Sequence, residues 1–272
     1  MNTMTAQYIC PICQDNLVQE THRFVCNQNH SFDIAKENYV NLLPVQFKRS
    51  KNPGDNKAMV NARREFLEKG FYKPLVDRLL TLYTTYGDNS TTMLDAGCGE
   101  GYYTHQHKTN TNTVYGVDIA KEAIKKAGKK YKECHFSVGT LSKLPFSEGM
   151  FDWIVSIYAP ILEQEFTRVL KPGGYLITVT PAKQHLSELK QAIYRDALEH
   201  DEEREPIENL RAVHEEKLSY EMLLADGQDV LNLLSMTPFA FKASEETKQQ
   251  LKLSTVFPCR ADFLIKLYQR PI

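Results

Sequence analysis

The 272-residue chain has almost no net charge, because 33 Lys and Arg stand against 34 Asp and Glu. Net charge therefore does not point to a polyanionic partner, although a local basic face would still suffice for nucleic acid. No apolar run is long enough to span a bilayer, and the opening MNTMTAQYIC lacks the basic and apolar regions of a signal peptide. We expect a cytoplasmic protein without a membrane partner.

Internal repeats and low-complexity tracts are also absent. With 42% hydrophobic and 25% charged residues, the composition is that of an ordinary globular protein. A chain of this length can bury a large core and exceeds the usual size of one domain. We expect one main domain and a smaller additional unit.

Cysteine is scarce, yet three of the six cysteines lie in CPICQDNLVQETHRFVCNQNH. In a reducing compartment such a cluster favours metal binding or catalysis over disulfides. The spacing Cys-x2-Cys, twelve residues, then Cys-x3-His predicts a closed, structural tetrahedral zinc site made of Cys10, Cys13, Cys26 and His30. The alternative is a redox pair, which would need its Cys-x-x-Cys at a helix start in a βαβ unit and would leave the other two ligands unexplained.

Two helices are expected between the N-terminal cysteine cluster and the first predicted strand. Asp55 is a candidate N-cap for a helix that reaches Lys69 and stops at Gly70, and a second helix is expected at 73–86. From residue 91 short apolar segments alternate with helical ones, which is typical of a parallel α/β sheet. The expected strands are 91–96, 113–118, 134–139, 151–158, 174–180, 215–224 and 261–269, and the helices between them are 102–109, 120–131, 161–170, 185–198 and 227–235.

A glycine-rich loop, LDAGCGEGYY, follows the strand that ends at Asp95. Its glycines allow a tight turn and close approach of a ligand. A dinucleotide-binding loop would have glycine where Tyr102 stands, and a phosphate-binding loop would carry Lys followed by Ser or Thr. Asp118 ends the next strand, where its carboxylate can accept hydrogen bonds from ribose hydroxyls. Two carboxylates stand at the ends of successive strands, around a loop that has no cation to bind phosphate. This arrangement suits a cationic nucleoside such as S-adenosylmethionine.

Four motifs in order, LDAGCGEG, GVDIA, LPFSEGMFDWIVS and RVLKPGGYLITVTP, resemble the class I S-adenosylmethionine-dependent methyltransferases over about residues 90–270. This resemblance implies a Rossmann-like fold with a seven-stranded, mostly parallel sheet, preceded here by a small zinc-binding domain. It implies that Gly97, Gly99 and Glu100 line the methionine end of the cofactor. Asp118 then holds the ribose, and Thr140 and Leu141 border the adenine.

The methyl acceptor is expected beyond the fourth strand, at Tyr158-Ala159-Pro160. The Asp/Asn-Pro-Pro-aromatic signature for exocyclic base amines is absent, as is a cysteine for attack on cytosine. A ring nitrogen or a small molecule remains. The zinc segment and a basic linker favour RNA. The residues we expect to contact the RNA backbone are Lys48, Arg49, Lys51, Arg63 and Arg64.

The whole chain resembles the ribosomal RNA large-subunit guanine-N1 methyltransferase family, on the motifs CPIC with C-x3-H, FDIAKENYVNLLPVQFKRSKNPGDN, ARREFLEKGFYKPL, DAGCGEGYYTH, IYAP, TPAKQHLSELK and MTPFAF. The resemblance implies methylation of N1 of one guanine in a 23S rRNA hairpin loop. It adds Tyr72 and His185 as cofactor contacts. As hypotheses, Tyr158 shapes the guanine site by stacking or through its hydroxyl, and His185 orients cofactor or base.

The resulting organisation is a zinc-binding RNA-recognition domain (1–45), a linker with helices (46–90) and a methyltransferase domain (91–272). Two other readings stay open at this point: a small-molecule methyltransferase with a structural zinc domain, and an RNA-binding protein with a vestigial cofactor site. A homodimer is a further expectation, because one compact chain offers limited surface to RNA. Loss of the zinc ligands is expected to impair RNA methylation more than cofactor binding.

Overall fold

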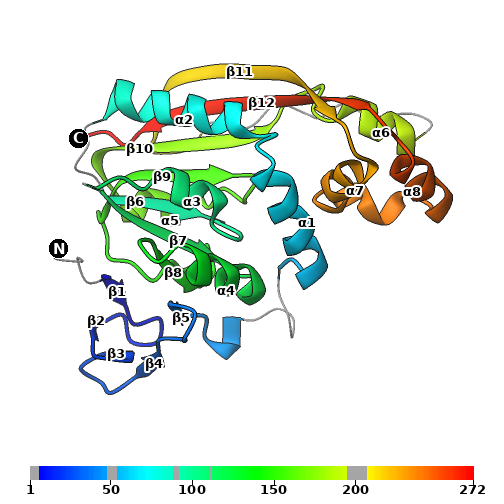
Figure 1. Ribbon diagram of the computed structural model, residues 1–272. Coiled ribbons are helices and arrows are strands. Elements are labelled where there is room, and N and C mark those ends of the chain that lie inside the picture. Colours follow the sequence, from blue (N-terminus) through cyan, green and yellow to red (C-terminus); the bar gives the residue numbers. More distant parts are fainter. Residues whose placement is uncertain (1–5, 48–53, 88–91, 111, 195–206) are drawn as a thin grey trace.

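The computed structural model describes residues 6–47, 54–87, 92–110, 112–194 and 207–272. Its centre is an eight-stranded sheet in the order β11-β12-β10-β9-β6-β7-β8-β5 (Figure 1). Strands β5 to β10 run parallel, whereas β12 is antiparallel to both β10 and β11. The strands are β5 (Tyr39–Asn41), β6 (Thr92–Ala96), β7 (Thr113–Asp118), β8 (His135–Val138), β9 (Phe151–Ile157), β10 (Leu170–Pro181), β11 (Arg211–Leu224) and β12 (Phe257–Gln269).

All seven strands expected from the sequence form, and the class I methyltransferase sheet is confirmed. The number seven was too small by one, because β5 pairs with β8 at the sheet edge through Tyr39↔Phe136 to Asn41↔Val138. A strand of three residues is too short to show an alternating pattern, so the sequence around it gave no separate signal. Its place was decided by the partner strand.

Helices cover the sheet and extend beyond it. Their bounds are α1 (Lys57–Glu68), α2 (Lys73–Tyr86), α3 (Tyr102–Gln106), α4 (Lys121–Lys130), α5 (Glu163–Val169), α6 (Ser187–Ile193), α7 (Gly227–Ser235) and α8 (Glu245–Lys252), with short 3-10 turns η1 (Val45–Phe47) and η2 (Pro238–Lys242). Among the described residues, no helix combines the length and apolarity needed to cross a bilayer.

Three of the helix predictions need correction. The N-cap of α1 is Asn56 rather than Asp55, because the Asn56 side chain accepts hydrogen bonds from the amides of Ala58 and Met59. Helix α3 ends at Gln106, earlier than expected, and α6 ends at Ile193. The end predicted for α6 near residue 198 lies outside the described residues. Helix α8 was not expected at all.

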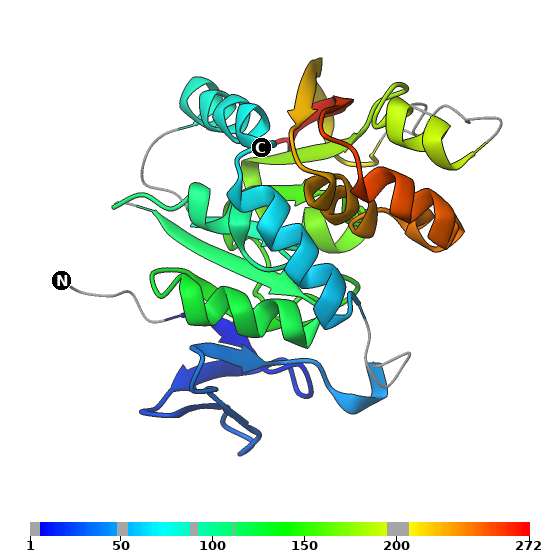
Figure 2. The same ribbon diagram turned by 45° about the vertical axis from the view of Figure 1, so that its right-hand side comes forward.

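The N-terminal segment forms its own four-stranded antiparallel sheet from β1 (Tyr8–Ile9), β2 (Asn16–Gln19), β3 (Arg23–Val25) and β4 (Ser31–Asp33). This small sheet lies directly below α4 and the β7–β8 edge in both views (Figures 1 and 2). Tyr8 packs against Tyr115 and Phe146 at ring distances of 5.8 and 5.5 Å. The two units therefore share one hydrophobic core, and the proposed boundaries at 45 and 90 stay predictions.

Candidate cofactor and metal sites

The glycine loop joins β6 to α3, and each of its three glycines has a positive φ. A Cβ on Gly97 would lie 2.4 Å from the Cβ of Ala159, and one on Gly101 would lie 2.9 Å from that of Ala127. At Gly99 the nearest atom would be Arg63 Nη1 at 3.6 Å, an ordinary contact. Gly97 and Gly101 therefore permit close packing of neighbouring elements, whereas a side chain at Gly99 would meet the Arg63 guanidinium without a clash.

Carboxylates surround this loop. Asp95 is 2% exposed and accepts a 2.6 Å hydrogen bond from the Thr104 hydroxyl. Asp118 accepts bonds from the amides of Ala120 at 2.7 Å and Gly99 at 2.9 Å, so its carboxylate fixes the loop from the end of the next strand. Each carboxylate oxygen has a second lone pair, which leaves capacity for a ribose hydroxyl.

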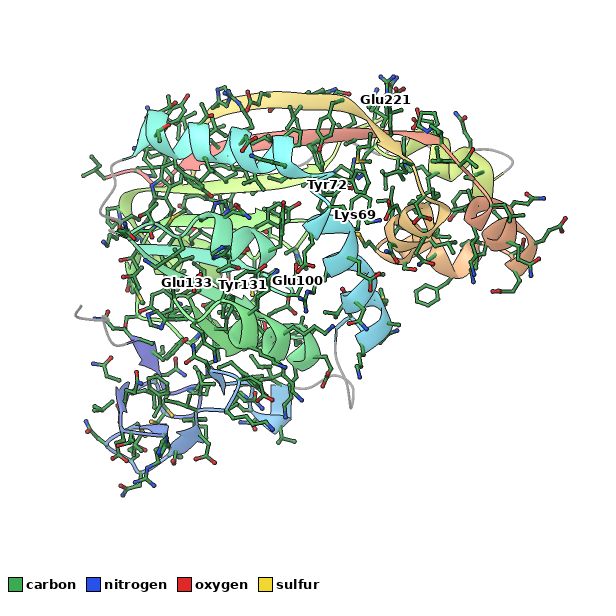
Figure 3. All side chains as sticks on the ribbon, viewed as in Figure 1. Lys69, Tyr72, Glu100, Tyr131, Glu133 and Glu221 are labelled. Atoms are coloured by element: carbon green, nitrogen blue, oxygen red, sulfur yellow. The ribbon has the colours of Figure 1, made fainter. Side chains whose placement is uncertain are left out.

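Burial also shifts the acidity of these groups. Desolvation raises the pKa of Asp95 to about 7, and the nearby charges of Asp118 and Glu100 add to the rise. Desolvation likewise raises the pKa of Glu100 to about 7 and that of Asp118 above its usual range. Glu100 lies on the α4 side of the loop, beside Tyr131 (Figure 3). Such a cluster is relieved by a cationic ligand, which fits a sulfonium cofactor.

The loop after β8 carries the two residues expected at the adenine. Leu141 approaches the glycine loop, with its Cδ1 3.9 Å from where a Cβ of Gly97 would stand. Thr140 forms a 2.8 Å hydrogen bond with the Ser142 hydroxyl instead of extending toward the loop. The structure therefore brings Leu141 to the glycine loop, and a side-chain contact of Thr140 with the adenine stays a prediction.

An aromatic cluster lies where the end of β9 and the segment after β10 meet the middle of β12 and the junction of α1 and α2. Tyr72, labelled in Figure 3, packs edge-on against Phe263 at 5.1 Å and lies 6.4 Å from the His185 ring. Tyr158 lies 5.6 Å from His185, and Tyr220 lies 6.2 Å from Phe263. The three residues predicted at the cofactor and acceptor are thus in one place. We call this set the aromatic cluster: Tyr72, Tyr158, His185, Tyr220 and Phe263.

Within the cluster, Tyr158 has a left-handed backbone, with φ of 56°. A bulky residue in this conformation is strained, and such strain is concentrated at functional sites. The side chain is held by a 3.0 Å hydrogen bond between its hydroxyl and His185 Nε2. Desolvation raises the pKa of the Tyr158 phenol well above its ordinary value, so the hydroxyl keeps its proton.

The hydrogen bonds of His185 define its tautomer. The backbone N–H of Asp262 donates to Nδ1 at 3.1 Å, so Nδ1 carries no proton. In the neutral ring the proton is then on Nε2, which donates to the Tyr158 oxygen. The Tyr158 O–H therefore remains a donor to a further acceptor.

The residues expected to contact RNA are only partly visible. Lys48, Arg49 and Lys51 lie outside the described residues. Arg63 pairs with Asp55 at 2.5 Å. Its guanidinium lies near Gly99, as described above, and offsets part of the rise that burial causes in the pKa of Asp118. Its position favours a role at the cofactor loop.

Arg64 pairs with Glu68 at 2.8 Å on the exposed side of α1. An arginine that is already paired can still exchange its carboxylate partner for a phosphate. Its contact with RNA stays a prediction.

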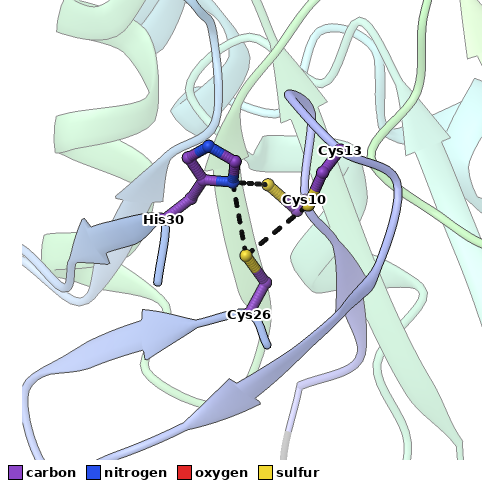
Figure 4. Close-up of side chains that lie close together, drawn as sticks. All are labelled: Cys10, Cys13, Cys26 and His30. Atoms are coloured by element: carbon purple, nitrogen blue, oxygen red, sulfur yellow. Dashed lines mark hydrogen bonds between the residues drawn. The ribbon is translucent and has the colours of Figure 1, made fainter. Parts of the chain in front are cut away.

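The four predicted metal ligands lie together in the small sheet (Figure 4), with all ligand atoms within 4.8 Å of one another. His30 Nδ1 is 3.6 Å from Cys10 Sγ and 3.4 Å from Cys26 Sγ, and Cys13 Sγ is 3.5 Å from Cys26 Sγ. A tetrahedral zinc with bonds of about 2.3 Å to sulfur separates its ligands by roughly 3.8 Å. The cluster therefore fits one structural zinc ion, bound through Nδ1 of the histidine.

The thiols of the metal site differ in acidity. Burial raises the pKa of the Cys26 thiol, but hydrogen bonds from the backbone amides of His30 and Gln28 and from Cys13 lower it to about 7, whereas burial raises the pKa of the Cys13 thiol to about 11. Metal binding requires the deprotonated form.

Sequence reasoning missed two members of the aromatic cluster, Tyr220 and Phe263. They come from β11 and β12, about 60 to 100 residues away in the chain from Tyr158. Tyr220 donates from its hydroxyl to the carbonyl of Phe71 at 2.8 Å, which ties β11 to the start of α2. The only sequence signal was an aromatic on a strand, which is common in any core, so nothing distinguished them.

Two family models match the chain: residues 8–51 match the zinc ribbon described as RlmA, N-terminal, and residues 87–234 match a methyltransferase domain. The protein YxjB of Bacillus subtilis (strain 168), whose name assigns it to the 23S rRNA (guanine-N(1)-)-methyltransferases, is 31% identical over 269 residues and covers 91% of each chain. This chain belongs to the 23S rRNA guanine-N1 methyltransferase family. Its cofactors are S-adenosylmethionine and zinc.

Other relatives agree with this membership of the guanine-N1 methyltransferase family. The 23S rRNA (guanine(748)-N(1))-methyltransferase of Streptomyces fradiae is 31% identical over 189 residues, which is 68% of this chain and 66% of that protein. A malonyl-[acyl-carrier protein] O-methyltransferase of Hamiltonella defensa is 33% identical over 107 residues, only 37% of this chain and 42% of that one. The sequence likeness to this O-methyltransferase is thus confined to a minor part of the chain.

Proposed function

We propose that this protein transfers the methyl group of S-adenosylmethionine to N1 of a guanine in a hairpin loop of 23S rRNA. The observation that carries the proposal is the joining, in one chain, of an RlmA-type zinc ribbon and a methyltransferase domain, with likeness to YxjB over 91% of both chains. A small-molecule methyltransferase would need no zinc ribbon packed against its catalytic sheet. The intact glycine loop and carboxylates also disfavour a vestigial site.

The cofactor is held, in this proposal, by three groups of residues. The backbone at Gly99 and the Asp95 and Glu100 carboxylates face its cationic end, and Asp118 accepts the ribose hydroxyls. When bound, the cofactor supplies an electrophilic methyl group on a sulfonium. The remaining candidate contacts are Tyr72, Gly97, Thr140, Leu141 and His185.

The chain's own residues supply the acceptor chemistry. N1 of guanine carries a proton at neutral pH, so formation of the N1–methyl bond is balanced by loss of that proton to water, and negative charge builds on O6 as the proton leaves. A donor aimed at O6 would stabilise this charge. The Tyr158 O–H, free to donate because His185 Nε2–H donates to its oxygen, is that donor. The aromatic cluster provides faces on which an unstacked base can stack.

The function is tested by following the methyl group. Purified protein is incubated with radiolabelled S-adenosylmethionine and either deproteinised 23S rRNA or a small-molecule extract, and the labelled product is identified. We expect label in the rRNA and a stop of reverse transcriptase at one guanine, because N1 methylation blocks base pairing. Label only in the extract would establish the small-molecule alternative, and label at a position that does not stop the polymerase would exclude N1.

The role of Tyr158 is tested by Tyr158→Phe, which removes the donor and keeps the ring. We expect turnover at saturating substrates to fall roughly 10- to 100-fold, while affinity for cofactor and RNA changes little. Tyr220→Phe is the matched control, because its ring lies in the same cluster and its hydroxyl donates to the backbone carbonyl of Phe71. Wild-type turnover in both Tyr158→Phe and His185→Ala would contradict the roles given to these residues.

Two finer predictions belong to the same proposal. The linker residues Lys48, Arg49 and Lys51 are expected to contact the RNA backbone, which makes affinity fall with salt. Association into a homodimer is expected to enlarge the RNA-binding surface. Sedimentation of the protein with and without the rRNA hairpin measures the oligomeric state. A monomer under both conditions would exclude a dimer.

A further inference from the structure

A row of exposed lysines runs along α4, between the zinc ribbon and α1. Lys121, Lys125 and Lys129 recur at intervals of four residues, so they share one face and are spaced about 6 Å apart along the axis. Lys132 follows the helix, and Lys36 lies on the adjoining turn of the N-terminal segment. All five residues are exposed. We call them the lysine strip: Lys36, Lys121, Lys125, Lys129 and Lys132.

The strip is continuous because the N-terminal segment is packed tightly against α4. A Cβ on Gly128 would lie 2.4 Å from the carbonyl oxygen of Glu37 and 2.8 Å from that of Asn38. The Asn38 side-chain amide donates to the carbonyl of Lys132. Figure 2 shows the zinc ribbon directly beneath α4, with α1 crossing the helix at one end. Lysines from both units therefore lie on one surface.

Carboxylates neutralise the strip only in part. Within the described ranges, Lys125 has Glu37 at 3.8 Å, whereas ion pairs do not involve Lys36, Lys121, Lys129 or Lys132. Glu122 shares the exposed face of α4, and Glu133 is paired with His105 at 2.5 Å. The strip thus keeps a net positive charge although the whole chain has a net charge of -1.

The other flank of α4 provides an internal comparison. Its lysines are engaged with α1: Lys126 bonds to the Asn61 side chain, and Lys130 pairs with Glu68. Those contacts explain the second flank as helix packing. The helix dipole favours Lys129, in the last turn of α4, but not Lys121, which sits in the first turn where a positive charge opposes the dipole. The dipole therefore does not explain the strip as a whole.

We propose that the lysine strip binds the phosphate backbone of the RNA that flanks the target loop. This inference rests on the proposed function. Helix α4 begins three residues after Asp118, so one end of the strip lies at the cofactor loop and the other reaches the zinc ribbon. Lysines in a row at this spacing suit successive phosphates of one strand, and they position RNA without reading its sequence.

The test compares two double variants of the full-length, zinc-loaded protein. Lys121→Ala/Lys129→Ala removes two strip lysines that form no ion pair with the described part of the chain, and Lys242→Ala/Lys252→Ala removes two exposed lysines at η2 and α8. Binding of a 23S rRNA hairpin transcript is measured from low to moderate salt. We expect the strip variant to bind several-fold more weakly, with a slope of log affinity against log salt that is shallower by about 1 to 2.

Three further readouts separate the possible outcomes. Affinity for S-adenosylmethionine should be unchanged in both variants, KM for RNA should rise without loss of kcat in the strip variant, and Lys121→Arg/Lys129→Arg should bind as wild type does. An unchanged salt slope, or equal losses in the two Ala variants, would overturn the inference. If wild type itself neither binds nor methylates the transcript, the proposed function fails; if wild type methylates it and the strip variant does so equally well, only this inference fails.

Discussion

At the scale of single residues, each glycine of the cofactor loop packs against a different neighbour. Gly97 permits the approach of Ala159, so it links the cofactor loop to the segment that begins with Tyr158. A Cβ on Gly99 would instead make an ordinary contact with the Arg63 guanidinium. The sequence pattern alone treats these glycines as equivalent, but their surroundings make the consequences of substitution different.

Gly97→Ala should abolish cofactor binding, because its new methyl group clashes with Ala159. A left-handed backbone alone costs an L-residue about 1–2 kcal/mol, and with the added clash the loss of folding free energy should be larger. Gly149→Ala is the matched control: its φ is also positive, at 61°, but its Cβ would meet nothing within 4 Å. Urea unfolding and calorimetric titration with S-adenosylmethionine measure both effects. Equal losses in the two variants would remove the clash from the explanation.

Cofactor affinity should depend on pH through the buried carboxylates. Because burial raises the pKa values of Asp95 and Glu100 to about 7, both are largely protonated at pH 6 and ionised at pH 8. The sulfonium form should therefore bind increasingly better than the neutral thioether product as pH rises from 6 to 8. Calorimetric titration with both ligands measures this ratio. A ratio that does not change with pH would show that neither carboxylate titrates against the cofactor charge.

The same two groups affect stability with the opposite dependence on pH. Their folded pKa values lie above the unfolded values of about 4, so the folded state binds more protons between pH 4 and 7. Their contribution to stability is therefore lost as pH rises through that window, and a bound cation restores part of it.

At the scale of elements, the start of α1 is fixed by a side chain that the sequence reading passed over. Two adjacent residues, Asp55 and Asn56, are both good N-caps, and the sequence could not rank them. In the structure Asn56 caps the helix, whereas Asp55 pairs with Arg63 one and a half turns into α1. Each carries a separate part of the local structure.

Asn56→Ala should therefore lower the free energy of unfolding by about 1 kcal/mol, because two amides of the first helical turn lose their acceptor. Asp55→Ala should cost less stability, since it removes a partly exposed ion pair and leaves the cap. Chemical denaturation of both variants ranks the two effects. A larger loss for Asp55→Ala would reassign the cap.

At the scale of the whole molecule, the zinc ribbon and the catalytic sheet are not independent. The backbone N–H of Ile9 donates to the carbonyl of Pro145 at 3.0 Å, and the Lys143 ammonium donates to the carbonyl of Pro11 at 3.4 Å. Pro145, the acceptor of the first bond, and Lys143, the donor of the second, both lie in the loop that carries Leu141. The CPIC knuckle, one side of the metal site, thus holds the loop expected at the adenine.

Removing zinc should consequently weaken cofactor binding several-fold as well as RNA methylation, and lower the Tm by several degrees, because the metal supplies folding energy to a unit that shares the core. Chelated protein and Cys26→Ser are compared with Cys134→Ser, which alters a buried thiol outside the metal site. Thermal unfolding and cofactor titration below the unfolding temperature measure the coupling. Unchanged cofactor affinity in zinc-free protein would contradict this coupling. It would instead support the expectation from the sequence that zinc loss impairs RNA methylation more than cofactor binding.

By itself, the sequence determined the α/β class, the seven strands with their order along the chain, the metal ligands and the glycine loop. These follow from local patterns: residue spacing, alternation and turn chemistry are all expressed within some 20 residues. Only the tertiary structure decided the place of β5, the joining of Tyr72, Tyr158 and His185 with aromatics from β11 and β12, the packing of the zinc ribbon and the surface shared by Lys36 and α4. These depend on contacts between residues far apart in the chain, which no local pattern records.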